Sequence, residues 1–70
     1  MSEAARLTIR EVEILRLVAL GYMNKQIATQ CHISEQTAKN SMTRIFRKLD
    51  AANRTQAVIK AAKCGLVPID

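Results

Sequence analysis

The apolar residues of this 70-residue chain recur at the period of an α-helix in four stretches, which short polar segments separate. In the first stretch, Thr8 and Glu11 form a T-x-x-E capping box, which predicts a helix that begins at Ile9. Gly21 ends this helix. The apolar face that we expect in the core is formed by Ile14, Leu15 and Val18. Three further apolar residues lie off that face: Ile9, Val12 and Leu20.

The second stretch predicts a short helix from about Asn24 to Gln30. Its inward residues are Ile27, Ala28 and Cys31. The start of this helix has no strong cap, because the side chain of Met23 cannot serve as one. Either Asn24 caps the helix, or its first N–H groups are left for another acceptor, such as a phosphate oxygen.

A tight turn then leads to a third helix from Glu35 to about Asp50, which Ser34 can cap. At 100° per residue, one narrow arc of this helix holds Ala38, Met42, Ile45 and Leu49. The opposite face is polar and basic and consists of Gln36, Lys39, Asn40, Thr43, Arg44 and Arg47. A helix that is merely solvated usually alternates both signs of charge, and this face contains no carboxylate. The second and third helices therefore have the outline of a helix-turn-helix, with Ala28 and Ala38 as the small contacts between them.

The last stretch predicts a fourth helix, which Asn53 and Gln56 open and Gly65 closes before Pro68. Its core contacts are assigned to Val58 and Ala61. A second small apolar strip is formed by Thr55, Ile59 and Ala62. A domain of this size has no interior left for that strip, so it predicts contact with a second copy of the chain.

The composition limits the fold to one small domain, which we assign to residues 1–70. A chain this short buries only roughly 60% of the surface of its unfolded form. Its aromatic residues are Tyr22 and Phe46, so the core must be aliphatic. With two Gly and one Pro, the chain is predicted to be all-α.

Positive charge is concentrated on the helix-turn-helix and the segment that follows it. The whole chain carries a net charge of +5. The charges of residues 1–24 cancel, whereas residues 25–63 contain eight Lys and Arg against two carboxylates, a net charge of +6. This excess favours a polyanionic partner over an ordinary solvated surface, and double-stranded DNA fits a helix-turn-helix.

The polar face of the third helix supplies the groups that read base edges in a major groove. Asn40 and Gln36 can each bond an adenine edge, Lys39 can donate to guanine, and Thr43 can meet a base through its methyl or hydroxyl group. Only the N-terminal half of such a helix normally reaches bases. We therefore assign phosphate contacts to Arg44 and Arg47 further along, and also to Lys25 and Thr37.

The sequence gives little support for metal binding, catalysis or membrane insertion. Cys31 and Cys64 lack a zinc-ligand spacing and are expected to be buried thiols, and the single His32 is expected on a surface turn. We therefore expect no catalysis, no metal site and no cofactor. Glu11 either caps the first helix or pairs with Arg54 or Lys48. Charges interrupt every apolar segment, so we expect neither a signal peptide nor a membrane span, and a cytoplasmic location.

Several motifs in order resemble the LuxR-type, or GerE-type, DNA-binding domain of bacterial transcriptional regulators. These are L-T-x-R-E-x-E-I-L (Leu7 to Leu15), G-Y-M-N-K-Q-I-A (Gly21 to Ala28), I-S-E-Q-T-A-K (Ile33 to Lys39), K-L (Lys48, Leu49) and N-R-T-Q-A (Asn53 to Ala57). The resemblance covers about Leu7 to Leu66.

This resemblance implies a four-helix domain that binds a partly palindromic operator as a homodimer, paired through its last helix. It also implies a place on the bacterial nucleoid and a contact with RNA polymerase or another regulator. A stand-alone regulator and a domain excised from a longer one both fit. The chain departs from the family pattern at Met23, Cys31, Ala38 and Ser41, where the family usually has Ser or Thr, Leu, Val and His.

Two alternative functions remain open at this point. One is a promoter-binding domain like region 4 of sigma factors, which shares the L-T-x-R-E opening but is not expected to carry the fourth helix and its apolar strip. The other is a small antagonist that heterodimerises with a full-length regulator, through the fourth helix or through Ile9, Val12 and Leu20. A neutral or acidic third helix would favour the antagonist, and here that helix is basic.

Overall fold

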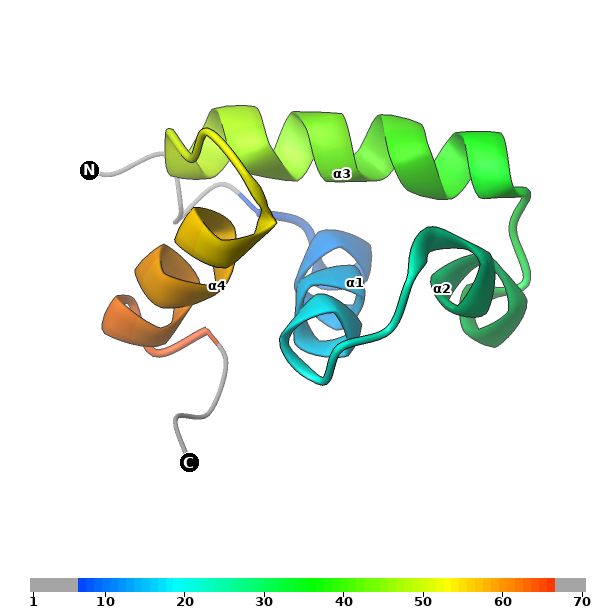
Figure 1. Cartoon of the computed structure of the whole chain (residues 1–70), viewed down its shortest axis with the longest axis horizontal. Coiled ribbons are helices and arrows are strands. Elements are labelled where there is room, and N and C mark those ends of the chain that lie inside the picture. The colour runs from blue at the N-terminus through cyan, green and yellow to red at the C-terminus, as the bar shows by residue number, and fades with distance from the viewer. Residues whose placement is uncertain (1–6, 67–70) are drawn as a thin grey trace.

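The computed structural model describes residues 7–66, and within that range the chain forms four α-helices (Figure 1). They are α1 (Ile9–Ala19), α2 (Asn24–Cys31), α3 (Glu35–Leu49) and α4 (Arg54–Lys63). This confirms the predicted all-α, four-helix fold. Pro68 and the two ends of the predicted domain lie outside the described residues.

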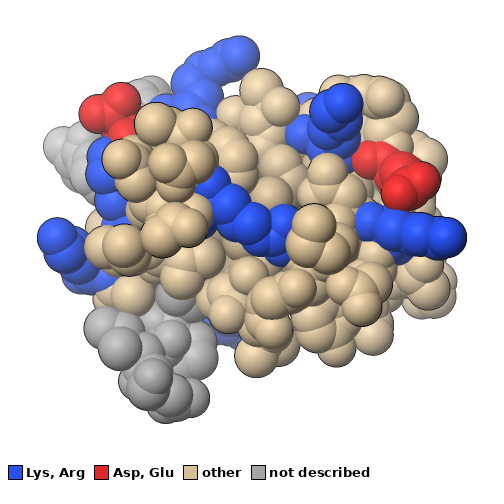
Figure 2. All heavy atoms as spheres, in the orientation of Figure 1, with Lys and Arg blue, Asp and Glu red and all other residues tan. Residues whose placement is uncertain are grey.

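The longest helix, α3, lies across the other three and contacts each of them (Figure 1). The N-terminal end of α3 lies near α2 and its C-terminal end near α4, with α1 between them. Figure 2 shows the same view with all side chains, in which acidic groups are visible only toward the left and right ends. This arrangement buries one side of α3 and leaves the opposite side open along its length.

Three of the four helices begin with the side-chain caps that the sequence predicts. Thr8 and Glu11 form the reciprocal capping box of α1, at 3.1 and 2.9 Å. Ser34 Oγ accepts the Thr37 N–H at 3.0 Å at the start of α3. Asn53 Oδ1 accepts the Gln56 N–H at 2.9 Å at the start of α4. These local bonds satisfy amides that the helices themselves leave without a partner.

The start of α2 differs from one of the two predicted alternatives. Asn24 is already the first helical residue, so it does not cap the helix, and the extended residue before it is Met23. Gln26 Oε1 accepts the Met23 N–H at 2.8 Å, but no side chain of the N-cap residue accepts from the first helical N–H groups.

The helix ends differ slightly from the predicted bounds. α2 continues to Cys31, and α3 stops at Leu49, because Asp50 turns into the left-handed region at φ 55°. His32 adopts the same conformation at φ 57° and is exposed, which confirms its predicted place on the turn. The turn closes when the Ile33 N–H donates to the Ala28 carbonyl at 3.0 Å. That bond fixes the angle between the two helices of the helix-turn-helix.

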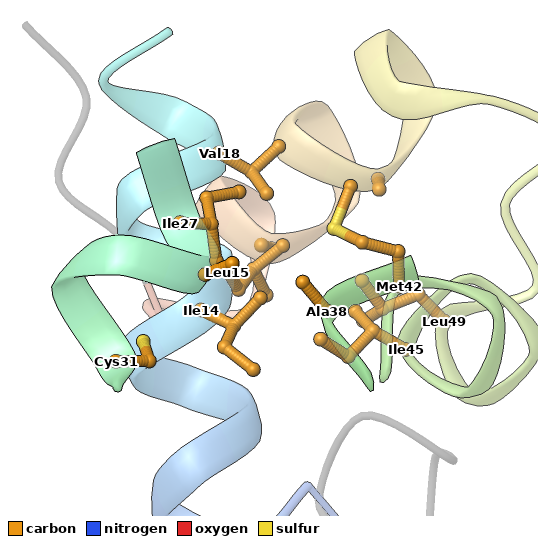
Figure 3. Packing of buried hydrophobic residues seen from close by; sticks show 12 residues of the cluster. Ile14, Leu15, Val18, Ile27, Cys31, Ala38, Met42, Ile45 and Leu49 are labelled. Carbon is orange, nitrogen blue, oxygen red and sulfur yellow. The ribbon is translucent and has the colours of Figure 1, made fainter. Parts of the chain in front are cut away.

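The core is aliphatic and draws on all four helices (Figure 3). The predicted core residues that are buried are Ile14, Leu15, Val18, Ile27, Ala28, Cys31, Ala38, Met42, Ile45, Leu49 and Ala61. On α4 the prediction was partly wrong, because Ala57 is fully buried whereas Val58 is only half-buried.

The prediction that Cys64 is a buried thiol was wrong. Cys64 is exposed at the end of α4. The chain turns back at this point, where the Leu66 N–H donates to the Ala61 carbonyl at 2.9 Å. This turn brings Leu66 against the core in place of the thiol.

Candidate nucleic-acid interface

The four predicted base-reading residues all lie on the open side of α3. Their side chains are exposed, whereas the opposite side of the helix is anchored by Ala38 and Ile45, both with an exposed fraction of 0%. The predicted division of α3 into an apolar and a polar face is therefore correct for these residues. The four are Gln36, Lys39, Asn40 and Thr43.

Two amide side chains on this face are joined to each other. Gln36 Nε2 donates to Asn40 Oδ1 at 3.0 Å, one helical turn along α3. The bond uses one N–H of Gln36 and one lone pair of Asn40, so each amide keeps both a donor and an acceptor. The pair can therefore meet a base edge without first breaking its own bond.

The hydroxyl groups of two threonines are oriented differently. Thr43 Oγ1 donates to the Lys39 carbonyl at 3.2 Å, which leaves its methyl group and a lone pair for a base. Thr37 Oγ1 instead accepts a hydrogen bond from Ser34 Oγ at 2.8 Å. The hydroxyl hydrogen of Thr37 can then be donated to an outside acceptor, as a phosphate contact requires.

The C-terminal half of α3 is tied to α1 through a buried carboxylate. Glu11 is 4% exposed, and its Oε1 lies 2.7 Å from Lys48 Nζ. Its Oε2 lies 3.7 Å from Arg44 Nε. Of the alternatives left open by the sequence, Glu11 both caps α1 and pairs with Lys48. Arg54 donates to the sulfur of Met23 at 3.8 Å instead.

Two opposing effects act on the pKa of Glu11. Burial raises it, because a charged carboxylate is poorly solvated there. The hydrogen bonds from Lys48 and Thr8, together with the positive charge of Lys48, lower it by more. The net pKa therefore lies below the ordinary value of 4.5, and the carboxylate is charged at neutral pH.

Ser41 is a residue at this site that the sequence reasoning did not assign. Its exposed fraction is 4%, and its Oγ accepts a hydrogen bond from Arg44 Nη2 at 3.3 Å. Its spacing supplies a signal, because position 41 lies three residues after Ala38 and four before Ile45, on the inward side of the helix.

The predicted phosphate contacts surround the base-reading residues on two helices. Lys25, in the first turn of α2, and Thr37, Arg44 and Arg47 on α3 are all exposed. Figure 2 shows Lys and Arg side chains spread over the face where α3 runs along the top. Exposed basic groups are therefore present on both helices of the helix-turn-helix.

The predicted dimer strip on α4 is narrower than the sequence suggests. Thr55 is exposed and Ile59 is 49% exposed, but Ala62 is half-buried because its small side chain packs against the core. Larger apolar exposure occurs at Ile9, the first residue of α1, with 82%, and at Leu20, directly after α1, with 72%.

Among residues 7–66, no helix has the length and apolar character needed to cross a membrane. Within the same range, no group of three or more His, Cys, Asp or Glu is placed to hold a metal ion.

A comparison with protein families decides the assignment. The family model of bacterial regulatory proteins of the luxR family, GerE, matches residues 5–61. The chain belongs to this family. It is thus a LuxR-family DNA-binding domain of a transcription regulator, as its motifs and its four helices indicate.

Curated relatives are similar over nearly the whole chain but are much longer. The HTH-type transcriptional regulator AlkS of Ectopseudomonas oleovorans is 46% identical over 63 residues, which are 90% of this chain and 7% of AlkS. The response regulator protein VraR of Staphylococcus aureus is 48% identical over 61 residues, 87% of this chain and 29% of VraR. The chain thus spans less than a third of the length of these relatives.

Solved structures give the same result. The transcription factor GerE has a TM-score of 0.85 and 36% identity, with 91% of this chain and 96% of that chain covered. The response regulator ChrA of a heme-sensing two-component system has a TM-score of 0.83 and 40% identity, with 86% of this chain and 30% of that chain covered.

Proposed function

We propose that this LuxR-family domain regulates transcription by binding a partly palindromic operator as a dimer, with α3 in the major groove. The observation that carries the proposal is the open face of α3, where amide, hydroxyl and basic groups lie exposed opposite a fully buried apolar side. A major groove admits one α-helix, and its base edges present distinct donors and acceptors. A face without carboxylates matches that environment.

The N-terminal half of α3 is assigned to base reading. The joined amides of Gln36 and Asn40 can each offer a donor and an acceptor to an adenine. Lys39 can donate to guanine, and Thr43 can contact a thymine methyl group or accept from a base amino group. These contacts set the sequence preference.

Phosphate contacts surround that region. Arg44 and Arg47 lie further along α3, Thr37 has a hydroxyl hydrogen to donate, and Lys25 lies in the first turn of α2. The positive end of the α2 dipole also favours a phosphate near Lys25. In a bacterial cell, this function implies a cytoplasmic protein on the nucleoid that meets RNA polymerase or another regulator.

Dimerisation is assigned to α4. Ile59 is half exposed beside Thr55, with Ala62 one turn further along. A two-fold interface would pair this strip with itself and separate the two α3 helices by about one turn of DNA, roughly 34 Å.

Selection of bound sites from random duplex DNA tests the proposal directly. We expect enrichment of two inverted half-sites at one fixed spacing. Enrichment of a single half-site would contradict the dimer, and no enrichment at all would contradict sequence-specific binding.

Ile59→Glu tests the dimer separately. We expect it to abolish cooperative binding to paired half-sites and to leave binding to a single half-site intact, because Ile59 lies on α4 and none of the proposed DNA contacts does. Ile9→Glu is the matched control, since it also places a charge on an exposed isoleucine but on α1. Equal behaviour of the two variants would exclude α4 as the interface.

The exposed Ile9 and Leu20 favour a second candidate function, a small antagonist that binds a full-length regulator through α1. Salt dependence separates the two functions. With roughly six to eight phosphates contacted per dimer, log affinity for DNA should fall with log salt at about −0.9 per phosphate. An absence of salt dependence would favour the antagonist.

A further inference from the structure

The side chain of Arg44 is exposed, but one edge of its guanidinium group contacts residues of two helices. Its side chain is 57% exposed. Nη2 donates to Ser41 Oγ at 3.3 Å, and Nε lies 3.7 Å from Glu11 Oε2. Both holding residues are 4% exposed, so their oxygens occupy fixed positions in the protein.

Both contacts fall on one edge of the guanidinium group. Nε and Nη2 form the inner edge. Of the five N–H donors of the planar fork, one on Nη2 is donated to Ser41, while Nε faces Glu11 at the longer distance of an ion pair. The remaining N–H groups, on Nη1 and the outer side of Nη2, are directed away from that edge. A phosphate oxygen pair can bind there in the bidentate way that guanidinium favours.

The carboxylate of Glu11 does not neutralise the positive charge of Arg44. Glu11 lies 2.7 Å from Lys48 Nζ and 1 Å further from Arg44 Nε, at 3.7 Å, so Lys48 is its principal partner. Arg44 thereby keeps its attraction for an anion while its direction is restricted.

We infer that Ser41 and Glu11 are positioning residues, which hold the Arg44 guanidinium in advance with its outer edge directed toward a DNA phosphate. The inference rests on the proposed phosphate contact of Arg44. A free arginine side chain loses many rotamers when it binds, and this loss weakens binding. A side chain that the fold already restrains loses fewer, so the same contact gives a higher affinity.

Ser41 allows the sharper test, because its removal changes no charge. We would measure affinity for the selected operator and its salt dependence for Ser41→Ala, Arg44→Ala and the double variant. Ser41→Ala should weaken binding about fivefold, as expected when one arginine side chain must be ordered on binding, with an unchanged salt slope. Arg44→Ala should weaken binding about tenfold and reduce the slope by about 1.8, because each protomer of the dimer loses one phosphate contact of about 0.9. Melting temperatures verify folding, and alanine suits a helix interior.

The double variant separates positioning from a merely structural role. If Ser41 acts through Arg44, Ser41→Ala should change affinity by less than about twofold when Arg44 is already absent. The same fivefold loss in both backgrounds would overturn the inference, as would unchanged binding by Ser41→Ala alone. Unchanged binding by Arg44→Ala would instead remove Arg44 from the proposed phosphate contacts. The measurements on Arg44→Ala and on Ser41→Ala therefore distinguish failure of the phosphate contact from failure of the positioning role.

Discussion

The two halves of α3 hold their polar side chains in different ways. In the N-terminal half, the bonds are local, such as the bond between Gln36 and Asn40 one turn apart. In the C-terminal half, Lys48 reaches Glu11, 37 residues away in sequence, and Arg44 approaches the same carboxylate. Substitutions in the base-reading half should therefore have little effect on the fold. The phosphate-binding half contacts Glu11, a carboxylate that also holds α1 in place, so substitutions there should affect stability.

Because Glu11 is buried, the contacts of the C-terminal half of α3 contribute more to stability than the local bonds of the N-terminal half. A local bond between exposed side chains one turn apart stabilises a helix by only about 0.2–0.5 kcal/mol. Glu11 is 4% exposed, and removal of one partner from a buried ion pair costs several times more, because the charges left behind are poorly solvated.

The largest expected effect comes from Glu11→Ala. We expect it to lower the free energy of unfolding by about 3 kcal/mol, because it removes a buried ion pair and half of the capping box together. Urea denaturation measures the change. Glu13→Ala is the matched control on the same helix, since its pair with Arg10 is exposed at 3.7 Å and should contribute less than about 0.5 kcal/mol. Similar losses of unfolding free energy for the two variants would mean that the contacts of Glu11 with the C-terminal half of α3 add no more stability than an exposed ion pair.

The local contacts of Glu11 could be predicted from the sequence, but its contact with another helix could not. The caps at Thr8, Ser34 and Asn53 depend on residues three apart, and the structure confirms them. The partner of Glu11 depends on how α1 and α3 cross, which helical periodicity does not specify. Two cations therefore remained possible until the fold was known.

Asn40→Ala is expected to have the next largest effect, on binding alone. It should cost about 1–3 kcal/mol on the preferred operator and relax the preference at one base pair. The free energy of unfolding should change by less than about 0.5 kcal/mol, since among residues 7–66 the side chain of Asn40 bonds to exposed Gln36 alone. Titrations on the operator and on random DNA measure both effects. Equal losses on the two DNAs would exclude Asn40 from the base-reading residues.

The candidate interface was predictable to the extent that it lies on one helix. The periodicity of α3 is sufficient to place Gln36, Lys39, Asn40 and Thr43 outward, and the structure agrees. It was less informative for α4, where Ala57 is buried and Val58 is only half-buried. Small apolar side chains cover most of that helix, so its apolar pattern does not define a single inward direction.

Arg47→Ala gives a smaller and uniform effect. We expect a loss of about 1 kcal/mol on every sequence and a salt slope reduced by about 1.8, because each protomer of the dimer loses one phosphate contact of about 0.9 and no base contact. Competition titrations at two salt concentrations measure both quantities. A loss of affinity confined to the preferred operator would instead assign base reading to the C-terminal half of α3 as well. The two halves would then not differ in function.

Acid titration should give the smallest effect, because the two influences on the pKa of Glu11 oppose each other. Burial raises that pKa, and the contacts with Lys48 and Thr8 lower it by more. Since the net pKa lies below 4.5, the charged carboxylate stabilises the fold above that pH, and this contribution is lost as the pH falls through the folded-state pKa. Glu11→Gln keeps an acceptor for the Thr8 N–H but does not titrate. Its stability should therefore fall less steeply below pH 4.5 than that of the unaltered chain, as measured by urea denaturation at each pH. Every other carboxylate is common to both chains, so parallel curves would mean that Lys48 and Thr8 do not hold Glu11 in its charged form.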